Sequence, residues 1–475
     1  MKLIRNYLYN AFYQVFILIV PFVTTPYLAR VLGPKGVGIN AYTNSVIQYF
    51  ILFGSIGVNL YGNRQIAFER DNRKKLTQTF YDIFLLRFFT TFLACLAFIV
   101  FLLIVDQYHV YYLAQAIAIV ASAFDISWFF MGIENFAITV LRNFFIRMVA
   151  LISIFVFVRS YDDLIVYILI LSISTLLGNL ILFPGLRKYI DRPNFSKINI
   201  WKHLLPSVSL FIPQIATQVY LVLNKTMLGA MVSVQASGYF EQSDKMIKMV
   251  LAVVTTGTVM LPHVANAFAK GENDKVKNYL YSSFSFVTFI SMPMMFGLMA
   301  VTPKFVPLFF TNRFMSVVPI MVIESIVILP IAWGNVVGSQ YLLPTKQNRS
   351  FIVSVIIGAI VNLVINIPLI ISMGAIGTAI ATVISELAVT LYQLLSVRKQ
   401  IKFKSLFSDF YKYLLAGIVM FIVVLYWDKL LSSSWISLLV EILIGAVVYL
   451  IILFLIRASI LNKAKDIFFF INDFK

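Results

Sequence analysis

The chain has 475 residues, of which 60% are hydrophobic and 12% are charged. These values leave no room for a soluble domain of ordinary composition. The formal net charge is +18, but the basic residues are spread among short loops and are not gathered on one soluble face, so we expect no nucleic acid as a partner.

Roughly fourteen hydrophobic stretches of about 18–27 residues follow one another along the chain, and a bilayer core about 30 Å thick is crossed by about 20 apolar helical residues. We therefore expect an all-α polytopic membrane protein with about 14 transmembrane helices. The predicted helices cover residues 6–28, 38–60, 78–105, 110–132, 136–158, 163–184, 204–228, 238–262, 281–303, 316–342, 350–371, 375–396, 411–428 and 434–456.

The distribution of basic residues predicts how these helices are oriented. If the N-terminus is cytoplasmic, about 26 of the 38 lysines and arginines fall on that side of the membrane, and about six fall on the other. Because basic loops stay cytoplasmic during insertion, we expect both termini inside the cell and an even number of spans.

Uncharged polar side chains lie within the apolar second and seventh predicted helices. Asn40 and Asn44 lie in the second helix, and Gln214 and Gln218 lie in the seventh. Amide groups can bind sugar hydroxyls, and they also form hydrogen bonds between membrane helices. We therefore name these four residues as candidate sugar ligands, with interhelical hydrogen bonding as the alternative.

Ionisable residues in the third to fifth predicted helices indicate a second kind of site. A charged side chain at the centre of a membrane helix costs about 2.5–3.5 kcal/mol on insertion scales, so it is kept where it faces water, a partner or a substrate. The third helix contains Arg87, the fourth Asp125 and the fifth Arg142. They predict either salt bridges that link the three helices or an inner site that receives an anionic headgroup.

The densest charged group lies in the seventh and eighth predicted helices and comprises Lys225, Glu241, Asp244, Lys245 and Lys248. Each of the two acids precedes a lysine by four residues, so each acid–lysine pair shares one helical face. Intrahelical ion pairs are one interpretation of this pattern. The other is a cationic lumen that binds a diphosphate through Lys225 and Lys248.

Arg30 is the counterpart of these lysines in the first half of the chain, at the outer end of the first helix. Its alternative role is that of an interfacial arginine that extends to the lipid headgroups. Glu386 lies nearest the midplane of the twelfth helix, and a lone carboxylate there is a candidate for coupling transport to H⁺ or Na⁺, with Asp125 as a second candidate. We expect no cofactor, and the three histidines have no metal-ligand spacing.

The chain divides into two halves of six predicted helices followed by a final pair. Leu32-Gly33 and residues 37–44 recur loosely as Leu228-Gly229 and residues 237–244, at the same outer turn of each half. Chance similarity is the alternative, but such repeats are typical of transporters whose substrate path lies between two lobes. We therefore expect a first lobe over 1–190, a second over 200–397, and two additional helices with a cytoplasmic tail over 398–475.

Residues 21–38, PFVTTPYLARVLGPKGVG, closely resemble the first-to-second-helix signature of bacterial polysaccharide repeat-unit flippases. These flippases belong to the multidrug/oligosaccharidyl-lipid/polysaccharide exporter superfamily. Residues 54–67, Asn224 to Gly229 and Gly238-Tyr239 extend the resemblance more weakly.

The resemblance implies a V-shaped bundle of two six-helix lobes around a hydrophilic cavity that works by alternating access. The implied cargo is an undecaprenyl-diphosphate-linked sugar unit of a capsule, exopolysaccharide or teichoic-acid precursor. It would move from the inner to the outer leaflet of the bacterial plasma membrane. A polymerase and glycosyltransferases of the same pathway are further expected partners.

Three other functions are weighed against this one. Lipid II flippases tend to carry basic residues where this chain has Ile51, Leu52 and Phe53. Separately, Asn224 stands where related chains often have an acid, so a role of that acid in ion coupling is not transferred to this chain. A multidrug cation antiporter of the same superfamily would need an acidic lumen. A glycan polymerase or glycosyltransferase would need catalytic acids on a long outer loop, whereas the longest predicted loop is about 20 residues and cytoplasmic, so we do not expect an enzyme.

Overall fold

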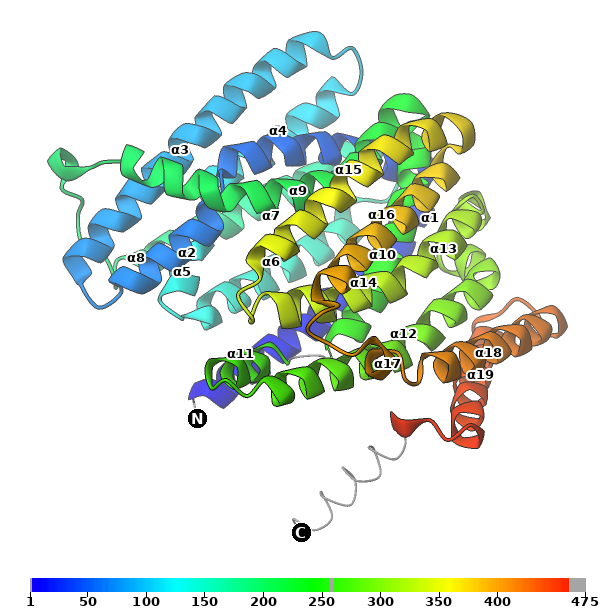
Figure 1. The fold of residues 1–475 in the computed structure, drawn as a ribbon. Helices are drawn as coiled ribbons and strands as arrows, with labels where there is room; N and C mark the ends of the chain where they lie inside the picture. The colour runs from blue at the N-terminus through cyan, green and yellow to red at the C-terminus, as the bar shows by residue number, and fades with distance from the viewer. Residues whose placement is uncertain (1, 257–259, 461–475) are drawn as a thin grey trace. The chain divides into compact units, whose positions relative to one another are not determined.

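The computed structural model describes residues 2–256 and 260–460, and within these ranges the chain is helical with short connections and no strand. It divides into two compact units, Met1–Gly238 and Tyr239–Lys475 (Figure 1). The predicted lobes of 1–190 and 200–397, and the final section 398–475, stay a prediction.

The first helices, up to the one that crosses the unit boundary, are α1 (Lys2–Ser55), α2 (Val58–Glu69), α3 (Arg73–Ile104), α4 (His109–Ala123), α5 (Ser127–Gly132), α6 (Phe136–Phe157), η1 (Tyr161–Asp163), α7 (Leu164–Leu180), α8 (Phe183–Leu186), η2 (Phe195–Lys197), α9 (Trp201–Met231) and α10 (Val234–Thr256). The second unit continues with α11 (Leu261–Ala269), α12 (Asn273–Phe309), η3 (Asn312–Phe314), α13 (Val317–Glu324), η4 (Ser325–Val327), α14 (Ile328–Gly334), η5 (Asn335–Leu342), α15 (Asn348–Met373), α16 (Ala375–Val397), α17 (Phe403–Leu406), α18 (Phe410–Leu430) and α19 (Trp435–Leu455).

The expected all-α polytopic fold is confirmed. Eleven helical segments in the described part of the chain are long and apolar enough to cross a membrane. The first of them, Ile19–Glu69, contains a backbone break at Gly33 and combines the second predicted helix with part of the first. The predicted helices 204–228 and 238–262 correspond to α9 and α10, which are not among the eleven. The predicted number of fourteen spans is therefore not confirmed.

Two backbone breaks shape the beginning of the chain. Gly33 has a φ of 63° and a ψ of −178°, which a residue with a side chain rarely adopts, and the following Pro34 disfavours helical geometry at the residue before it. Farther along, Ile56 and Gly57 have φ values of 39° and 75°. The predicted helix 38–60 is therefore split between α1 and α2.

The two loosely repeated blocks of the sequence come into close contact within the first unit. A Cβ atom on Gly238 would lie 2.8 Å from the Cα atom of Gly38, and one on Gly38 would lie 2.0 Å from the Val234 carbonyl oxygen. A Cβ atom on Gly229 would lie 2.0 Å from the Tyr42 ring. Only glycine permits approaches this close. The glycines that the two blocks share are therefore needed for the blocks to pack against each other.

The connection between α8 and α9 is fixed to α3. Arg73 at the start of α3 forms an ion pair with Asp191 at 2.9 Å. About two and a half turns farther along α3, the buried Asp82 carboxylate accepts a hydrogen bond from the Asn199 N–H at 3.0 Å and pairs with Lys202 Nζ at 2.8 Å. These contacts make the connection a structured part of the first unit.

In the second unit, Lys304 of α12 joins that helix to the last two helices. Lys304 Nζ lies 2.5 Å from Glu441 Oε1 in α19 and 3.2 Å from Asp428 Oδ1 in α18. Lys304 is 7% exposed and Glu441 is fully buried, so the pair is shielded from solvent. The helices α18 and α19 closely match the predicted spans 411–428 and 434–456.

Candidate functional site

The first unit contains a polar cavity of about 360 Å³. Its walls come from α1 to α7 and from the break between α4 and α5. Of the 18 described residues that line it, only Ile51, Ala118, Ile168 and Leu171 are apolar. In a unit built of membrane-crossing helices, such a wall needs a polar occupant or water.

The break between α4 and α5 supplies one carboxylate to the cavity. α4 ends at Ala123 and α5 begins at Ser127, and the Asp125 side chain accepts a hydrogen bond from the Ser127 N–H at 3.0 Å. This bond satisfies one of the free N–H groups at the start of α5. The break also leaves the Ser122 carbonyl oxygen available to a side-chain donor.

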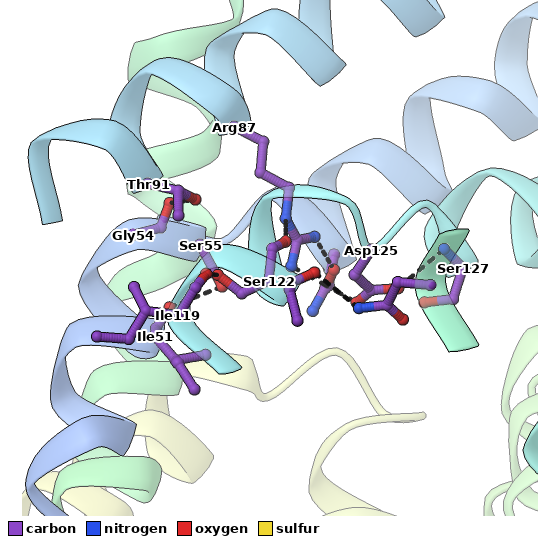
Figure 2. Close-up of polar contacts among 12 residues, drawn as sticks. Ile51, Gly54, Ser55, Arg87, Thr91, Ile119, Ser122, Asp125 and Ser127 are labelled. Atoms are coloured by element: carbon purple, nitrogen blue, oxygen red, sulfur yellow. Dashed lines mark hydrogen bonds and ion pairs between the residues drawn. The ribbon is translucent and has the colours of Figure 1, made fainter. Parts of the chain in front are cut away.

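Arg87 of α3 reaches across to this break, as Figure 2 shows. Its Nε donates to the Ser122 carbonyl oxygen at 2.5 Å, and its Nη1 donates to Asn59 Oδ1 at 2.5 Å. Its Nη2 lies 3.5 Å from Asp125 Oδ2. Arg87 is 1% exposed, so a buried guanidinium fixes the break in α4–α5 relative to α2 and α3.

Arg142 of α6 provides the second positive charge in the cavity wall. Its Nη1 donates to Asn179 Oδ1 in α7 at 3.0 Å, and its Nε and Nη2 donate to Asn143 Oδ1 at 2.9 and 2.5 Å. Asn179 in turn donates to the Ala121 carbonyl oxygen at 2.7 Å. Amide groups thus set the direction of this guanidinium.

One face of α1 contributes a row of amides to the cavity wall. Asn40, Asn44 and Gln48 are spaced four residues apart, which places them on one helical face. Gln115 of α4 donates to Asn40 Oδ1 at 3.3 Å, and Gln48 donates to Asn44 Oδ1 at 3.4 Å. Asn44 and Gln48 are exposed, so the cavity opens to the surface of the first unit on this side.

The structure brings together five of the residues that the sequence predicted. Arg87, Asp125, Arg142, Asn40 and Asn44 all line the cavity. The predicted salt bridge between the third and fourth helices is the Arg87–Asp125 pair, and it lies in the wall of the cavity that an anionic group would enter. The structure therefore contains the salt bridge predicted for Arg87, whereas anion binding by this residue stays a prediction.

The predicted residues of the seventh and eighth helices lie elsewhere. Lys245 pairs with Glu241 at 3.2 Å, and Lys248 pairs with Asp244 at 2.6 Å, so both predicted intrahelical ion pairs form in α10. Lys225 is half-buried in α9. Their role in diphosphate binding stays a prediction.

The remaining predicted residues whose side chains the structure describes do not line this cavity. Arg30 is exposed and donates to the Pro26 carbonyl oxygen at 3.0 Å, one turn back in α1. Gln218 is exposed in α9, and the side chain of Gln214 lies outside the described residues. Glu386 is half-buried in α16 of the second unit, and its coupling role stays a prediction.

Sequence reasoning missed the contribution of α7 to the cavity. Ser172, Thr175 and Asn179 line it from one helical face. Their spacing of three and four residues within an apolar helix was the available signal. No group of three or more His, Cys, Asp and Glu residues in the described ranges could hold a metal ion.

A family model described as polysaccharide biosynthesis protein matches residues 3–268. The "Putative O-antigen transporter" of Escherichia coli K12 is 23% identical over 413 residues, which cover 84% of this chain and 97% of that protein. The lipopolysaccharide biosynthesis protein WzxC of the same organism is 34% identical over 91 residues, 19% of this chain and 18% of that protein.

Two solved structures are similar in fold. The lipid II flippase MurJ in an inward closed conformation has a TM-score of 0.70 at 17% identity, covering 96% of this chain and all of that one. The Vibrio cholerae MATE transporter VcmN has a TM-score of 0.52 at 13% identity, covering 82% of this chain and 95% of that one. At these identities the likeness shows the fold alone.

Proposed function

Because the chain belongs to the polysaccharide biosynthesis protein family, we propose that it is a flippase that moves a lipid-linked oligosaccharide repeat unit across a membrane. The chain is a multi-pass membrane transporter and not an enzyme. The names of the full-length relatives, which specify O-antigen transport, support a saccharide as the cargo.

The observation that carries the proposal is the polar cavity inside a unit of membrane-crossing helices. A sugar or phosphate that leaves water for a membrane must exchange its hydration for fixed donors and acceptors, because an unpaired polar group in hydrocarbon is costly. The amides, hydroxyls and guanidinium groups of this wall supply such partners. Two arginines and one carboxylate make the wall unfavourable for the cations that a multidrug antiporter moves.

We further propose that the protein moves an undecaprenyl-diphosphate-linked repeat unit from the inner to the outer leaflet of the bacterial plasma membrane by alternating access. Both termini are cytoplasmic, in agreement with the distribution of basic residues. A polymerase and glycosyltransferases would be partners in the same pathway.

The proposed ligands fall into two sets. Residues of the cavity, among them Asn40, Asn44 and Arg142, bind the saccharide part. Arg30, Lys225 and Lys248 bind the diphosphate, which needs positive charge and charge-assisted hydrogen bonds when it leaves water. This second set is supported by the density of lysines in α9 and α10. Lys245, Gln214 and Gln218 are proposed as additional contacts, and Glu386 or Asp125 as the site of H⁺ or Na⁺ coupling.

The test uses the purified full chain in liposomes that contain a fluorescent undecaprenyl-diphosphate-linked oligosaccharide. We expect the protein to make the inner-leaflet pool accessible to a membrane-impermeant reagent faster than protein-free liposomes do. Lys225→Glu should lower this rate by about tenfold or more, since it replaces an attractive charge by a repulsive one, whereas Lys225→Arg should retain most of it.

A rate equal to that of protein-free liposomes would contradict the flippase assignment. Normal transport by both Lys225→Glu and Lys248→Glu would contradict only the diphosphate clamp. Lys248→Glu also removes the ion pair with Asp244, so Asp244→Asn, which removes the same pair but keeps the lysine, is the matched control for lost helix stability.

A further inference from the structure

We propose that the first unit binds one anionic phospholipid in a groove between α3 and the connection that leads from α8 to α9. The acyl chains lie at the apolar end of this groove, and the phosphate lies at its basic end. The groove shares no lining residue with the polar cavity. The inference goes beyond the proposed function, because it does not depend on the cargo that the protein transports.

The wall of the groove suits hydrocarbon chains. Its volume is about 630 Å³, within the range of about 300–1,000 Å³ that is typical of sites for small molecules. The described lining residues are Leu85, Phe88, Phe89 and Phe92 of α3 and Ile198, Asn199, Ile200 and Trp201. Trp201 begins α9, and its ring meets the Phe89 ring edge-on with 5.7 Å between the centroids. Seven of these eight side chains are apolar or aromatic, so the groove favours an acyl chain over water.

The sequence of α3 gives the groove a polar end and an apolar end. Gln78, Asp82 and Phe89 follow one another at four and seven residues, so they lie along one face of the helix. The connection runs along this face. Gln78 Nε2 donates to the Lys197 carbonyl oxygen at 2.8 Å, and the Asp82 carboxylate accepts from the Asn199 N–H at 3.0 Å. The connection therefore passes from polar residues near the start of α3 to the aromatic residues beyond them.

The connection is basic, which makes it complementary to an anionic lipid. Residues 187–202 contain one acid and five basic residues, all of them exposed: Asp191, Arg187, Lys188, Arg192, Lys197 and Lys202. Asp191 pairs with Arg73 at 2.9 Å, and Lys202 pairs with Asp82 at 2.8 Å. Lys197 directly precedes the lining residues and forms no ion pair with a described residue. Because lysines at a membrane surface attract anionic lipids, Lys197 selects a lipid with a net negative charge.

The groove lies at the depth where a phospholipid joins its phosphate to its chains. α3 is one of the membrane-crossing helices, and the connection follows it on the side that the basic residues predict to be cytoplasmic. Trp201 is 59% exposed, as expected for an aromatic residue at the membrane–water interface. Asn199 is the single polar residue among the described lining residues, so the groove offers few partners to sugar hydroxyls. A phospholipid therefore matches it better than the oligosaccharide-bearing cargo does.

The experiment uses Trp201 as a fluorescent probe in the wall of the groove. The purified full chain is placed in vesicles of phosphatidylglycerol and phosphatidylcholine in which one of the two lipids carries bromine atoms on its acyl chains, and bromine quenches tryptophan on contact. The chain has five tryptophans, so the contribution of Trp201 is the difference between the parent and Trp201→Phe. We expect brominated phosphatidylglycerol to quench this contribution with about fivefold higher apparent affinity than brominated phosphatidylcholine.

Two variants separate a defined site from general attraction to a positive protein. Lys197→Gln should lower the preference for phosphatidylglycerol about fivefold, to near parity, because it removes the charge beside the groove. Lys404→Gln is the matched control, since it removes an exposed lysine from α17 of the second unit. It should keep the parental preference. The contribution of Trp435 in α19, obtained in the same way from Trp435→Phe, should show no preference between the two lipids.

Equal quenching of Trp201 by the two brominated lipids, or an unchanged preference in Lys197→Gln, would overturn the site. The same preference at Trp435 as at Trp201 would also overturn it, because it would show general enrichment of anionic lipid around the protein. Undecaprenyl-diphosphate oligosaccharide added at the mole fraction of the brominated lipid should leave the quenching of Trp201 unchanged. A loss of quenching would assign the groove to the cargo and contradict a phospholipid site.

Discussion

Arg87 has a buried charge that is held by three groups from separate segments of the first unit. They are the Asn59 amide oxygen, the Ser122 carbonyl oxygen and the Asp125 carboxylate. If the guanidinium is removed, all three lose a partner, and of the three residues Ser122 is buried, Asp125 is partly buried and Asn59 is exposed. Breaking a buried pair in this way is far more costly than losing a pair on a surface.

We therefore expect Arg87→Met to destabilise the protein by about 3–5 kcal/mol, because the side chain keeps its approximate volume but removes the cation from Asp125 and one donor from the Ser122 carbonyl. Thermal denaturation of the purified protein in detergent measures the effect. Arg147→Met removes an exposed arginine from α6 and should change the midpoint little. Equal midpoints for Arg87→Met and the parent would show that the network does not stabilise the first unit.

At this scale, the sequence identified the charged residues of the cavity better than its uncharged ones. Arg87, Asp125 and Arg142 stand out because an ionisable residue in an apolar helix is costly and needs a reason. Asn179 and Gln115 do not stand out, since single amides commonly join membrane helices. Only the folded backbone shows that these two amides line the same cavity as the arginines.

At the scale of the element, the accuracy of the prediction depends on what ends each helix. The predicted helices 411–428 and 434–456 match α18 and α19 to within about two residues, because charged and polar residues bound their apolar runs. The predicted helix 110–132 is interrupted between Ala123 and Ser127. Phe124-Asp125-Ile126 contains neither Gly nor Pro, so the break depends on contacts such as that of Arg87 with the Ser122 carbonyl.

The pair between Lys304 and Glu441 provides a prediction about how elements are joined. Lys304→Met should destabilise the attachment of α18 and α19 to α12 by about 3–5 kcal/mol, because it leaves the fully buried Glu441 carboxylate without its partner. The double variant Lys304→Met/Glu441→Leu should recover much of that loss, since two apolar side chains replace the pair. Thermal denaturation in detergent tests whether the double variant is more stable than Lys304→Met.

A double variant that is less stable than Lys304→Met alone would contradict this interpretation. Lys429→Met is a suitable control, because it removes a lysine at the end of α18 beside Asp428 in the sequence. It should leave the denaturation midpoint close to that of the parent.

At the scale of the whole molecule, we predict that α18 and α19 help to hold the polyprenyl tail of the cargo. They follow the two predicted six-helix halves, and no charged residue lies between Leu414 and Trp427. A deletion of residues 410–475 would expose the buried Lys304, so it is made in the Lys304→Met background. This truncated protein should transport the lipid-linked cargo at least about tenfold more slowly than full-length Lys304→Met.

Normal transport by the truncated protein, present at the same level in the liposomes, would contradict a role in tail binding. A water-soluble form of the cargo with a short lipid chain distinguishes tail binding from general damage. The truncation should reduce binding of the long-chain cargo more than binding of the short-chain one, because the buried apolar area differs between them.

The general architecture was the most predictable property, since hydropathy, loop length and charge asymmetry all depend on the bilayer. The boundary of the compact units was less predictable. Residues 201–238, which follow the predicted first lobe, group with the first unit. Their packing depends on contacts such as Gly38 against Gly238, which no hydropathy pattern reveals.

The fixed connection between α8 and α9 has a consequence for the order of events during synthesis. The Asp82 carboxylate accepts a hydrogen bond from the N–H of Asn199, which lies 117 residues farther along the chain. At about 5–20 residues per second, the ribosome adds that residue roughly 6–23 s after Asp82. Until then the Asp82 carboxylate has only local partners such as Gln78, so α3 cannot reach its final surroundings before the connection between α8 and α9 has been synthesised.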